Sequence, residues 1–210
     1  IAANAMQGLV EPASCGIGGD LFAIVWDAKT KKLHGLNASG RSPRSLTLEH
    51  FEKLKLKQIP THGPLPISVP GCVDGWIELH EKFGKLPLKQ ILQPAIDYGE
   101  QGFPLTEIIA RGMAGSVNAY KKYPGWSEVY TPGGRLPFKG MIFKNPALAR
   151  TYRMIARGGR ETFYKGAVAK QIAQFVKEHG GFLTAADLAD HHSEWVAPVS
   201  TTYRGHTVWE

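Results

Sequence analysis

The sequence predicts an α+β fold whose strands lie towards the two ends of the chain and whose middle is helical. An apolar run over 21–27 is followed by a charged turn and a second short strand, which together predict a β-hairpin. From residue 72 onward, apolar residues recur three and four positions apart, as in amphipathic helices. The final stretch, 197–210, reads as two strands joined at Arg204-Gly205. The sheet is therefore expected to draw on both ends of the chain.

The beginning of the chain is expected to form a helix, a glycine-rich turn and the hairpin. Residues 1–10 are rich in alanine and read as the end of a helix, which Pro12 and the glycines of 16–19 stop. The strand LFAIVWD, 21–27, is so continuously apolar that we expect neither of its faces to contact water. The strand KLHGLN, 32–37, completes the hairpin.

Helices are expected to dominate the rest of the chain. A weak helix over 45–55 precedes an extended segment, because the prolines of 61–71 disfavour helix. Pro94 should kink its helix or restart it, whereas 123–144 should be a loop rich in glycine and proline. Thr184 is expected to cap a short helix. The longer helical patterns cover 73–84, 86–103, 105–123, 145–159 and 162–181.

The composition is that of an ordinary globular protein, since 43% of the 210 residues are hydrophobic and 20% are charged. The formal net charge is +7, but the basic residues are scattered and no recognition motif accompanies them, so we expect a solvated basic surface and no nucleic-acid partner. No apolar run approaches the roughly 18 residues that span a bilayer. The chain opens inside a helical pattern and closes inside a strand pattern, so we expect 1–210 to be truncated at both ends, which leaves the compartment open.

The glycine-rich turn before the hairpin raises the question of a phosphate site. A dinucleotide-binding loop has three spaced glycines between a strand and a helix, but here the third glycine is missing and the turn leads from a helix into a strand. Asp20 would also repel a phosphate. Cys15 could act as a nucleophile only with a histidine such as His34 fixed beside it, which nothing in the spacing establishes. We therefore expect the glycines to be structural, allowing positive φ and close approach of the backbone.

The run DLADHHSE is a candidate metal site, because its two histidines lie among the acidic residues Asp187, Asp190 and Glu194. Adjacent side chains at His191 and His192 point to different faces, which suits a single ion poorly, and histidine is also favourable near a helix C-terminus. We therefore expect no metal and no cofactor. Cys15 and Cys72 lack metal-ligand spacing and are expected to be buried thiols.

The loop NASGRSPRS carries Arg41 and Arg44 directly after the second strand. Loops on rigid strands often present binding groups, and the arginine fork pairs with a carboxylate. From the residues alone, a substrate-binding arginine and a solvated surface arginine are equally open. The run STTYRGH, 200–206, places hydroxyl groups near a histidine, a pattern too common to indicate a catalytic base.

Taken together and in order, several segments resemble the large subunit of the gamma-glutamyltransferase family. The stretch 10–43 is similar to the family's Pro-x-Ser-x-Gly-x-Gly-Gly turn and the two-stranded hairpin that follows it. The stretch 67–105 is similar to its Val-Pro-Gly, Gly-x-Leu-Pro and Gly-Phe-Pro series. The stretch 158–191 resembles its Phe-Tyr-x-Gly helix and its Gly-Gly-x-Leu-Thr turn, and 198–210 resembles the strands after that. The resemblance spans nearly the whole chain.

This resemblance implies an N-terminal-nucleophile hydrolase with an αββα sandwich, of which the chain would be the helix-rich large-subunit portion. It implies a precursor that cuts itself before a threonine, which becomes the N-terminal nucleophile of a small subunit. That small subunit is the expected partner, and a γ-glutamyl amide such as glutathione is the expected substrate, its acyl group passing to water or an amino acid. The family's Thr-Thr-His nucleophile segment is not found here, since the Thr-Thr of 201–202 is followed by Tyr203, so no catalytic residue is expected in this chain.

One position departs from the family pattern. In the family, an arginine of an Arg-Glu-x-x-Pro run binds the α-carboxylate of the substrate, and counting back from Pro43 places Ser39 at that position. Arg41 lies two residues later. Ser39 and Arg41 are therefore the candidate substrate-binding residues. Either Arg41 binds the α-carboxylate in place of the family's arginine, or the pocket binds an acyl group other than γ-glutamyl. The alternatives are an acylase-like relative that cuts another amide, such as a glutaryl-β-lactam, and a non-catalytic binding relic of the fold.

Overall fold

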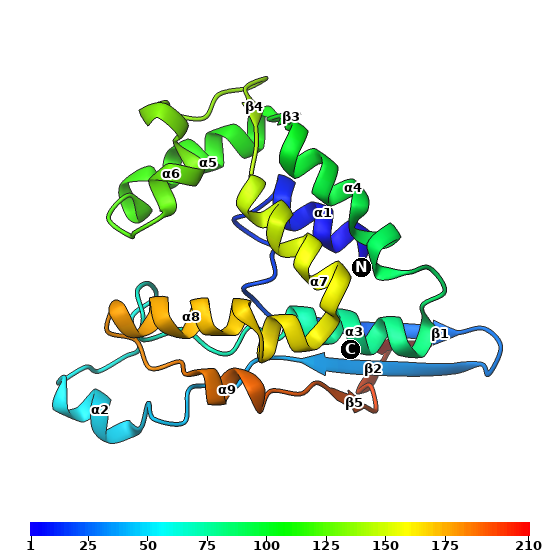
Figure 1. Cartoon of the computed structure of the whole chain (residues 1–210). Coiled ribbons are helices and arrows are strands. Elements are labelled where there is room, and N and C mark those ends of the chain that lie inside the picture. Colours follow the sequence, from blue (N-terminus) through cyan, green and yellow to red (C-terminus); the bar gives the residue numbers. More distant parts are fainter. The chain divides into compact units, whose positions relative to one another are not determined.

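The computed structural model describes residues 1–210 and divides them into two compact units (Figure 1). The first unit comprises Ile1–Gly16 and Gly84–Thr162, and the second comprises Ile17–Phe83 and Phe163–Glu210. Helices occur in both units and the main sheet lies in the second, in agreement with the predicted α+β class.

The first unit is mainly helical. Helix α1 (Ala2–Val10) packs against α4 (Leu88–Gln101). The two-residue strands β3 (Phe103–Pro104) and β4 (Ile142–Phe143) pair antiparallel. The other elements are α5 (Glu107–Tyr120), α6 (Trp126–Tyr130), a 3₁₀ turn (Pro132–Gly134) and α7 (Pro146–Tyr164), the last two residues of which belong to the second unit. One cluster of the core consists of Leu9, Phe103, Leu105, Ala110, Met113 and Phe143.

Three details of this unit differ from the sequence-based expectation. Helix α4 does not restart at Pro94 but runs through it as one element, because a proline costs a helix one hydrogen bond that packing of an apolar face can offset. The predicted loop over 123–144 contains α6, the 3₁₀ turn and β4, which are too short to show a period in the sequence. Helix α7 continues past its expected end to Tyr164, with a non-helical backbone only at Gly159 (φ 54°).

The second unit is built on a three-stranded antiparallel sheet with the order β1-β2-β5. The predicted hairpin is confirmed as β1 (Leu21–Asp27) and β2 (Lys32–Ala38), paired with Leu21 opposite Ala38. Strand β5 (Glu194–Val196) adds to β2 with Trp195 opposite Leu36. The sheet thus joins distant parts of the chain, but the later strand is β5, a three-residue strand that the sequence did not reveal, whereas the final strands expected to join it form a sheet of their own.

Helices and a separate hairpin complete the second unit. Helix α3 (Cys72–Phe83) lies against β1 and β2 (Figure 1), and a side chain at Gly75 would meet Leu21 and Ala38. The other elements are α2 (Leu48–Lys53), α8 (Ala167–Glu178), α9 (Ala185–Ala189), β6 (Ser200–Tyr203) and β7 (His206–Trp209). The predictions of a Thr184 cap and of a final hairpin turning at Arg204-Gly205 are both confirmed.

The face of β1 that does not pack on α3 is exposed. Phe22, Ile24 and Trp26 retain 68%, 45% and 59% of their accessible surface. The expectation that neither face of this strand contacts water is therefore wrong for this chain, because none of residues 1–210 covers the side chains that alternate with the half-buried ones.

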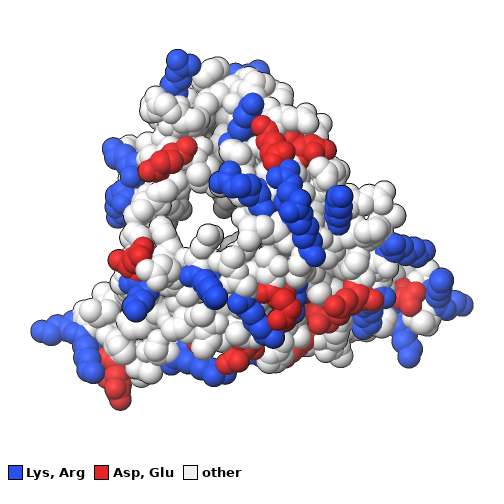
Figure 2. All heavy atoms as spheres, viewed as in Figure 1, with Lys and Arg blue, Asp and Glu red and all other residues white.

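The charged side chains on the face drawn in Figure 2 are mixed in sign. On the face drawn in Figure 2, Lys and Arg lie among Asp and Glu instead of gathering in one patch. None of the helices combines the length and the apolar character that a membrane-crossing helix requires.

Candidate functional site

The glycine-rich turn is joined to the loop that follows β2. The Asp20 carboxylate accepts a hydrogen bond from the backbone N–H of Gly40 at 2.7 Å, and the carbonyl of Gly19 accepts one from the N–H of Cys72 at 2.9 Å. On the other side of the loop, the N–H of Val69 donates to the carbonyl of Arg41 at 3.0 Å. The loop carrying the candidate residues is therefore held from two directions.

The tightest backbone packing occurs at glycines beyond the turn. A Cβ at Gly40 would lie 1.6 Å from the carbonyl oxygen of Val69, and a Cβ at Gly71 would lie 2.0 Å from that of Ala38. Gly18 has no heavy atom within 4 Å of the same position. The expected close approach therefore does not apply to Gly18. It applies to Gly40 and Gly71, where the loop after β2 meets the segment before α3.

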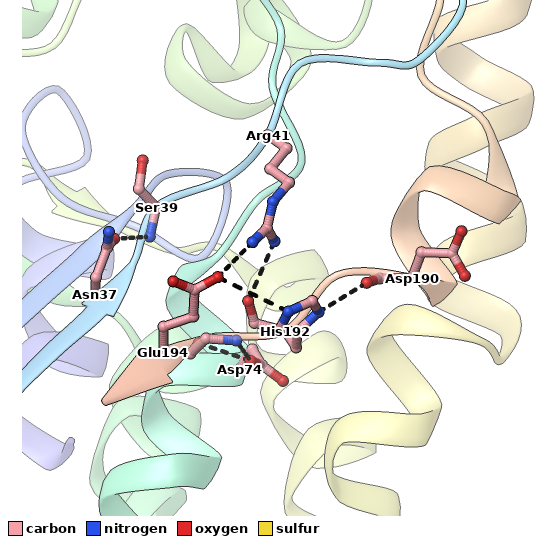
Figure 3. A network of polar contacts seen from close by, with 8 residues as sticks. Asn37, Ser39, Arg41, Asp74, Asp190, His192 and Glu194 are labelled. Atoms are coloured by element: carbon pink, nitrogen blue, oxygen red, sulfur yellow. Dashed lines mark hydrogen bonds and ion pairs between the residues drawn. The ribbon is translucent and has the colours of Figure 1, made fainter. Parts of the chain in front are cut away.

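Arg41 makes an ion pair within the second unit. Its Nη2 lies 2.6 Å from Oε1 of Glu194, and its Nη1 donates to the carbonyl of His192 at 3.5 Å. Figure 3 shows the guanidinium group directed towards both partners. The side chains of Arg41 and Glu194 are each about half exposed, at 55% and 51%. The charge of this arginine is thus partnered by a carboxylate that remains in contact with solvent.

The residues on both sides of Glu194 are anchored. The buried Asp74 accepts hydrogen bonds from the N–H and the hydroxyl of Ser193, both at 2.6 Å. Trp195 donates from its indole Nε1 to Glu78 at 2.7 Å, and the ammonium of Lys82 lies 3.7 Å from the centre of a Trp195 ring. Asp74 and Glu78 both belong to α3, so this helix fixes the start of β5.

Arg41 lines a small pocket of about 200 Å³ in the second unit. Arg44, another lining residue, pairs with Asp190 at 2.9 Å, and its backbone N–H donates to Asp187. The remaining lining residues are Ser42, Val69, His191 and His192. The pocket thus contains charges of both signs, each arginine being paired with a carboxylate.

Asp187 is a further carboxylate of this pocket and caps α9. Its burial would raise its pKa, but hydrogen bonds from the Thr184 side chain and from the backbone N–H groups of Arg44 and Thr184, with the nearby Arg44 charge, hold the pKa below its usual range. Thr184 and Asp187 form a reciprocal capping box at the start of the helix. Asp187 is therefore expected to be ionised at neutral pH.

Ser39 lies outside the pocket. It is half-buried, its backbone N–H donates to the side chain of Asn37 at 2.9 Å, and it is not among the lining residues. Its hydroxyl points away from the Arg41–Glu194 pair in Figure 3. Of the two candidate binding residues, the structure brings only Arg41 to the pocket.

The other candidates from the sequence do not form reactive groups. The side chains of 187–194 do not converge into a set of three that could hold one metal ion, and Glu194 is instead bound by Arg41.

Cys15 lies in the first unit and is half-exposed, contrary to the expected burial, whereas Cys72 is buried as expected. His34 packs edge-on against Phe83 and Trp195 in the second unit. The run 200–206 falls on the final hairpin, as expected.

The sequence did not identify Glu194 as the partner of Arg41, or Asp74 as the partner of Ser193. Glu194 was noticed only within a candidate metal cluster, because nothing in the chain indicates that residues separated by more than 150 positions meet. The one available signal for Asp74 was an acidic residue among the apolar residues at the start of a helix, where acids are also favourable for the helix dipole.

Comparison with known proteins gives the family. The family model for gamma-glutamyltranspeptidase matches residues 1–210. The chain belongs to this family. Glutathione hydrolase-like YwrD proenzyme from Bacillus subtilis is 33% identical over 211 residues, covering all of this chain and 40% of the relative. Oxamate amidohydrolase proenzyme from Klebsiella pneumoniae is 33% identical over 215 residues, with the same coverage.

Solved structures of gamma-glutamyltranspeptidases and a related acylase share the fold. Cephalosporin acylase from Bacillus halodurans superimposes with a TM-score of 0.94 and 41% identity, over 99% of this chain and 40% of that protein. The gamma-glutamyltranspeptidase of Helicobacter pylori gives a TM-score of 0.93 and 29% identity, over 99% of this chain and 60% of that one. The chain spans about two fifths of the length of the curated relatives it matches.

Proposed function

We propose that residues 1–210 are the large-subunit part of a self-processing amidohydrolase or acyltransferase that takes a γ-glutamyl or related acyl group, for example from glutathione. The family match over the whole chain carries this proposal. Relatives named glutathione hydrolase proenzymes, such as that of Bacillus subtilis at 30% identity over 205 residues, support it.

The chemical step belongs to residues outside this chain. An N-terminal threonine of the small subunit attacks the amide carbonyl, with its own α-amine acting as the base. Backbone groups of the same subunit stabilise the tetrahedral intermediate, and the acyl group then passes to water or to an amino acid. The contribution of residues 1–210 is to bind the acyl group, and Arg41 is the residue suited to its carboxylate because a guanidinium fork offers two parallel hydrogen bonds.

The exposed apolar side of the sheet supports a small-subunit partner. A groove of about 620 Å³ lies over β1, β2 and the segment after β5, and its lining is mainly apolar. A contiguous apolar patch on a protein surface commonly marks an interaction site. We propose that the small subunit of the same precursor covers this side. The exposed residues are Phe22, Ile24, Trp26, Val196 and Val199.

The proposal is tested first by self-processing. The full-length precursor should separate into two chains on purification, and N-terminal sequencing of the smaller chain should begin with threonine. Replacing that threonine by alanine should leave the precursor uncut and inactive. An uncut wild-type precursor that is nevertheless active would contradict the mechanism, and the absence of a threonine at the cut position would favour a non-catalytic binding relic of the fold.

The substrate is tested at Arg41. In the processed enzyme, Arg41→Ala should raise KM for γ-glutamyl-p-nitroanilide at least tenfold, because the substrate carboxylate loses a charged hydrogen-bond partner. Arg111→Ala removes an exposed arginine that pairs with Glu107 in the first unit and serves as the matched control. Unchanged kinetics in Arg41→Ala would assign this side chain to the surface and weaken the γ-glutamyl interpretation.

An acylase acting on another amide is the second candidate function. Two observations favour it, namely the 41% identity to a cephalosporin acylase and a serine at position 39, where the family resemblance implies an arginine. Comparing hydrolysis of γ-glutamyl-p-nitroanilide with that of glutaryl-p-nitroanilide distinguishes the two. A clear preference for the glutaryl compound, which lacks the α-amino acid head group, would support the acylase.

A further inference from the structure

We infer that Glu194 is a specificity-determining residue, which holds Arg41 in an internal ion pair that a substrate carboxylate must displace. The inference rests on the proposed function and deepens it, because it states how the acyl pocket discriminates between charged and uncharged acyl groups. Four observations lead to it: the occupied arginine fork, the anchoring of Glu194, the exposure of the pair and the charges around it.

The outer end of the Arg41 fork is already occupied. Nη2 lies 2.6 Å from Glu194 Oε1, and Nη1 faces the His192 carbonyl at 3.5 Å (Figure 3). A carboxylate forms its strongest contact with arginine through two parallel N–H···O bonds. A substrate carboxylate that uses Nη1 and Nη2 therefore has to replace Glu194 at the guanidinium group.

The position of Glu194 is set by the buried structure beneath it. Ser193 is bound through its N–H and its hydroxyl to the buried Asp74, and Trp195 is bound to Glu78. Strand pairing adds a further constraint, because Glu194 lies opposite Asn37 and the next residue opposite Leu36. The carboxylate is thus presented to Arg41 from an ordered backbone, which reduces the conformational entropy lost on forming the pair. This distinguishes it from an incidental surface contact between two mobile side chains.

The pair is nevertheless weak enough to exchange. Both side chains are about half exposed, and solvent screens ion pairs of this kind so that they contribute little net free energy. His192 Nε2 lies 3.8 Å from the same carboxylate oxygen, so Glu194 keeps a polar neighbour after displacement. A substrate carboxylate can therefore take the place of Glu194, at a modest loss of apparent affinity.

The charges around the pocket do not attract an anion by themselves. Arg41 and Arg44 contribute two positive charges, and Glu194, Asp187 and Asp190 contribute negative charges close to them. Because each arginine is paired with a carboxylate, an acyl group bearing a carboxylate gains from the pocket only by competing with one of these acids. Removal of the Glu194 charge should therefore favour charged acyl groups selectively.

The experiment compares two substrates of nearly identical shape in the processed full-length enzyme. One is γ-glutamyl-p-nitroanilide and the other is the analogue in which the α-carboxylate is an α-carboxamide. For Glu194→Gln we expect KM for the carboxylate substrate to fall about two- to fivefold, as follows from an exposed pair of this strength, and KM for the carboxamide to stay the same. Glu81→Gln, an exposed neutralisation on α3, is the matched control and should leave both values unchanged.

Two outcomes would overturn the inference. A rise in KM for the carboxylate substrate would mean that Glu194 orients Arg41 for binding, and equal changes for both substrates would mean a general structural effect. If Glu194→Gln does not process, Glu194→Asp serves instead, since a shorter acid weakens the same contact and should lower the KM of the carboxylate substrate by a smaller factor. If the proposed function itself is wrong, the wild-type enzyme will hydrolyse neither anilide, a result that differs from both outcomes above. The inference would then be wrong as well.

Discussion

The carboxylate of Asp20, the residue before β1, accepts a hydrogen bond at 2.7 Å from the backbone N–H of Gly40, which lies two residues beyond the end of β2. The hairpin brings these two positions together, because Leu21 pairs with Ala38 in the antiparallel register. This contact connects the glycine-rich turn with the loop that carries Arg41. The turn therefore contributes to the candidate site through Asp20, which holds the loop that carries Arg41 by this hydrogen bond.

Replacing Asp20 by alanine should displace that loop. A single hydrogen bond at an exposed position contributes about 0.5–1.5 kcal/mol. We therefore expect Asp20→Ala to raise KM for γ-glutamyl-p-nitroanilide about two- to tenfold in the processed enzyme. Asp20→Asn keeps an oxygen acceptor for the Gly40 N–H and should stay close to wild type. Steady-state kinetics of the two variants provide the comparison, and equal behaviour would show that this hydrogen bond does not position the loop.

Gly40 and Gly71 should tolerate no side chain, whereas Gly18 should. A Cβ at Gly40 or Gly71 would overlap a backbone carbonyl, at 1.6 Å and 2.0 Å, and backbone cannot move aside as the end of a flexible side chain can. We expect Gly40→Ala and Gly71→Ala to lower the midpoint of thermal unfolding of the full-length protein by several degrees or to prevent its accumulation. Gly18→Ala has open space and is the matched control. A Gly40→Ala protein as stable as this control would contradict the close approach.

The sequence was informative where local chemistry decides the structure. The hairpin followed from an apolar run, a charged turn and a return strand, and the α9 cap followed from Thr184 before a short helical pattern. The loop position alone left Arg41 open as a binding or a surface residue, the family resemblance made it a candidate, and the structure puts it in a pocket. These features depend on residues that are close together in the chain.

The sequence did not predict the features that depend on contacts between residues far apart in the chain. Strand β5 exists because β2 offers it a partner, and a three-residue segment has no period of its own. The contact between Arg41 and Glu194 joins residues 153 positions apart, and no local rule predicts it. The prediction that both faces of β1 are buried was wrong for a related reason. A continuous apolar run indicates that both faces of a strand are covered, but it does not indicate whether the covering residues belong to the same chain.

Asp187 should make the stability of the protein sensitive to acid. Its pKa is lower in the folded state than in the unfolded chain, so the stability it contributes is fully present above the unfolded value, about 3.9, and is lost as the pH falls through the folded pKa. The asparagine variant, Asp187→Asn, can still accept a hydrogen bond from Thr184 but does not titrate. We therefore expect the wild type to be the more stable protein above about pH 5 and this difference to shrink below about pH 4. Thermal unfolding of both full-length proteins between pH 7 and pH 3 measures it, and a difference that does not change over this range would show that Asp187 titrates alike in the folded and unfolded chains.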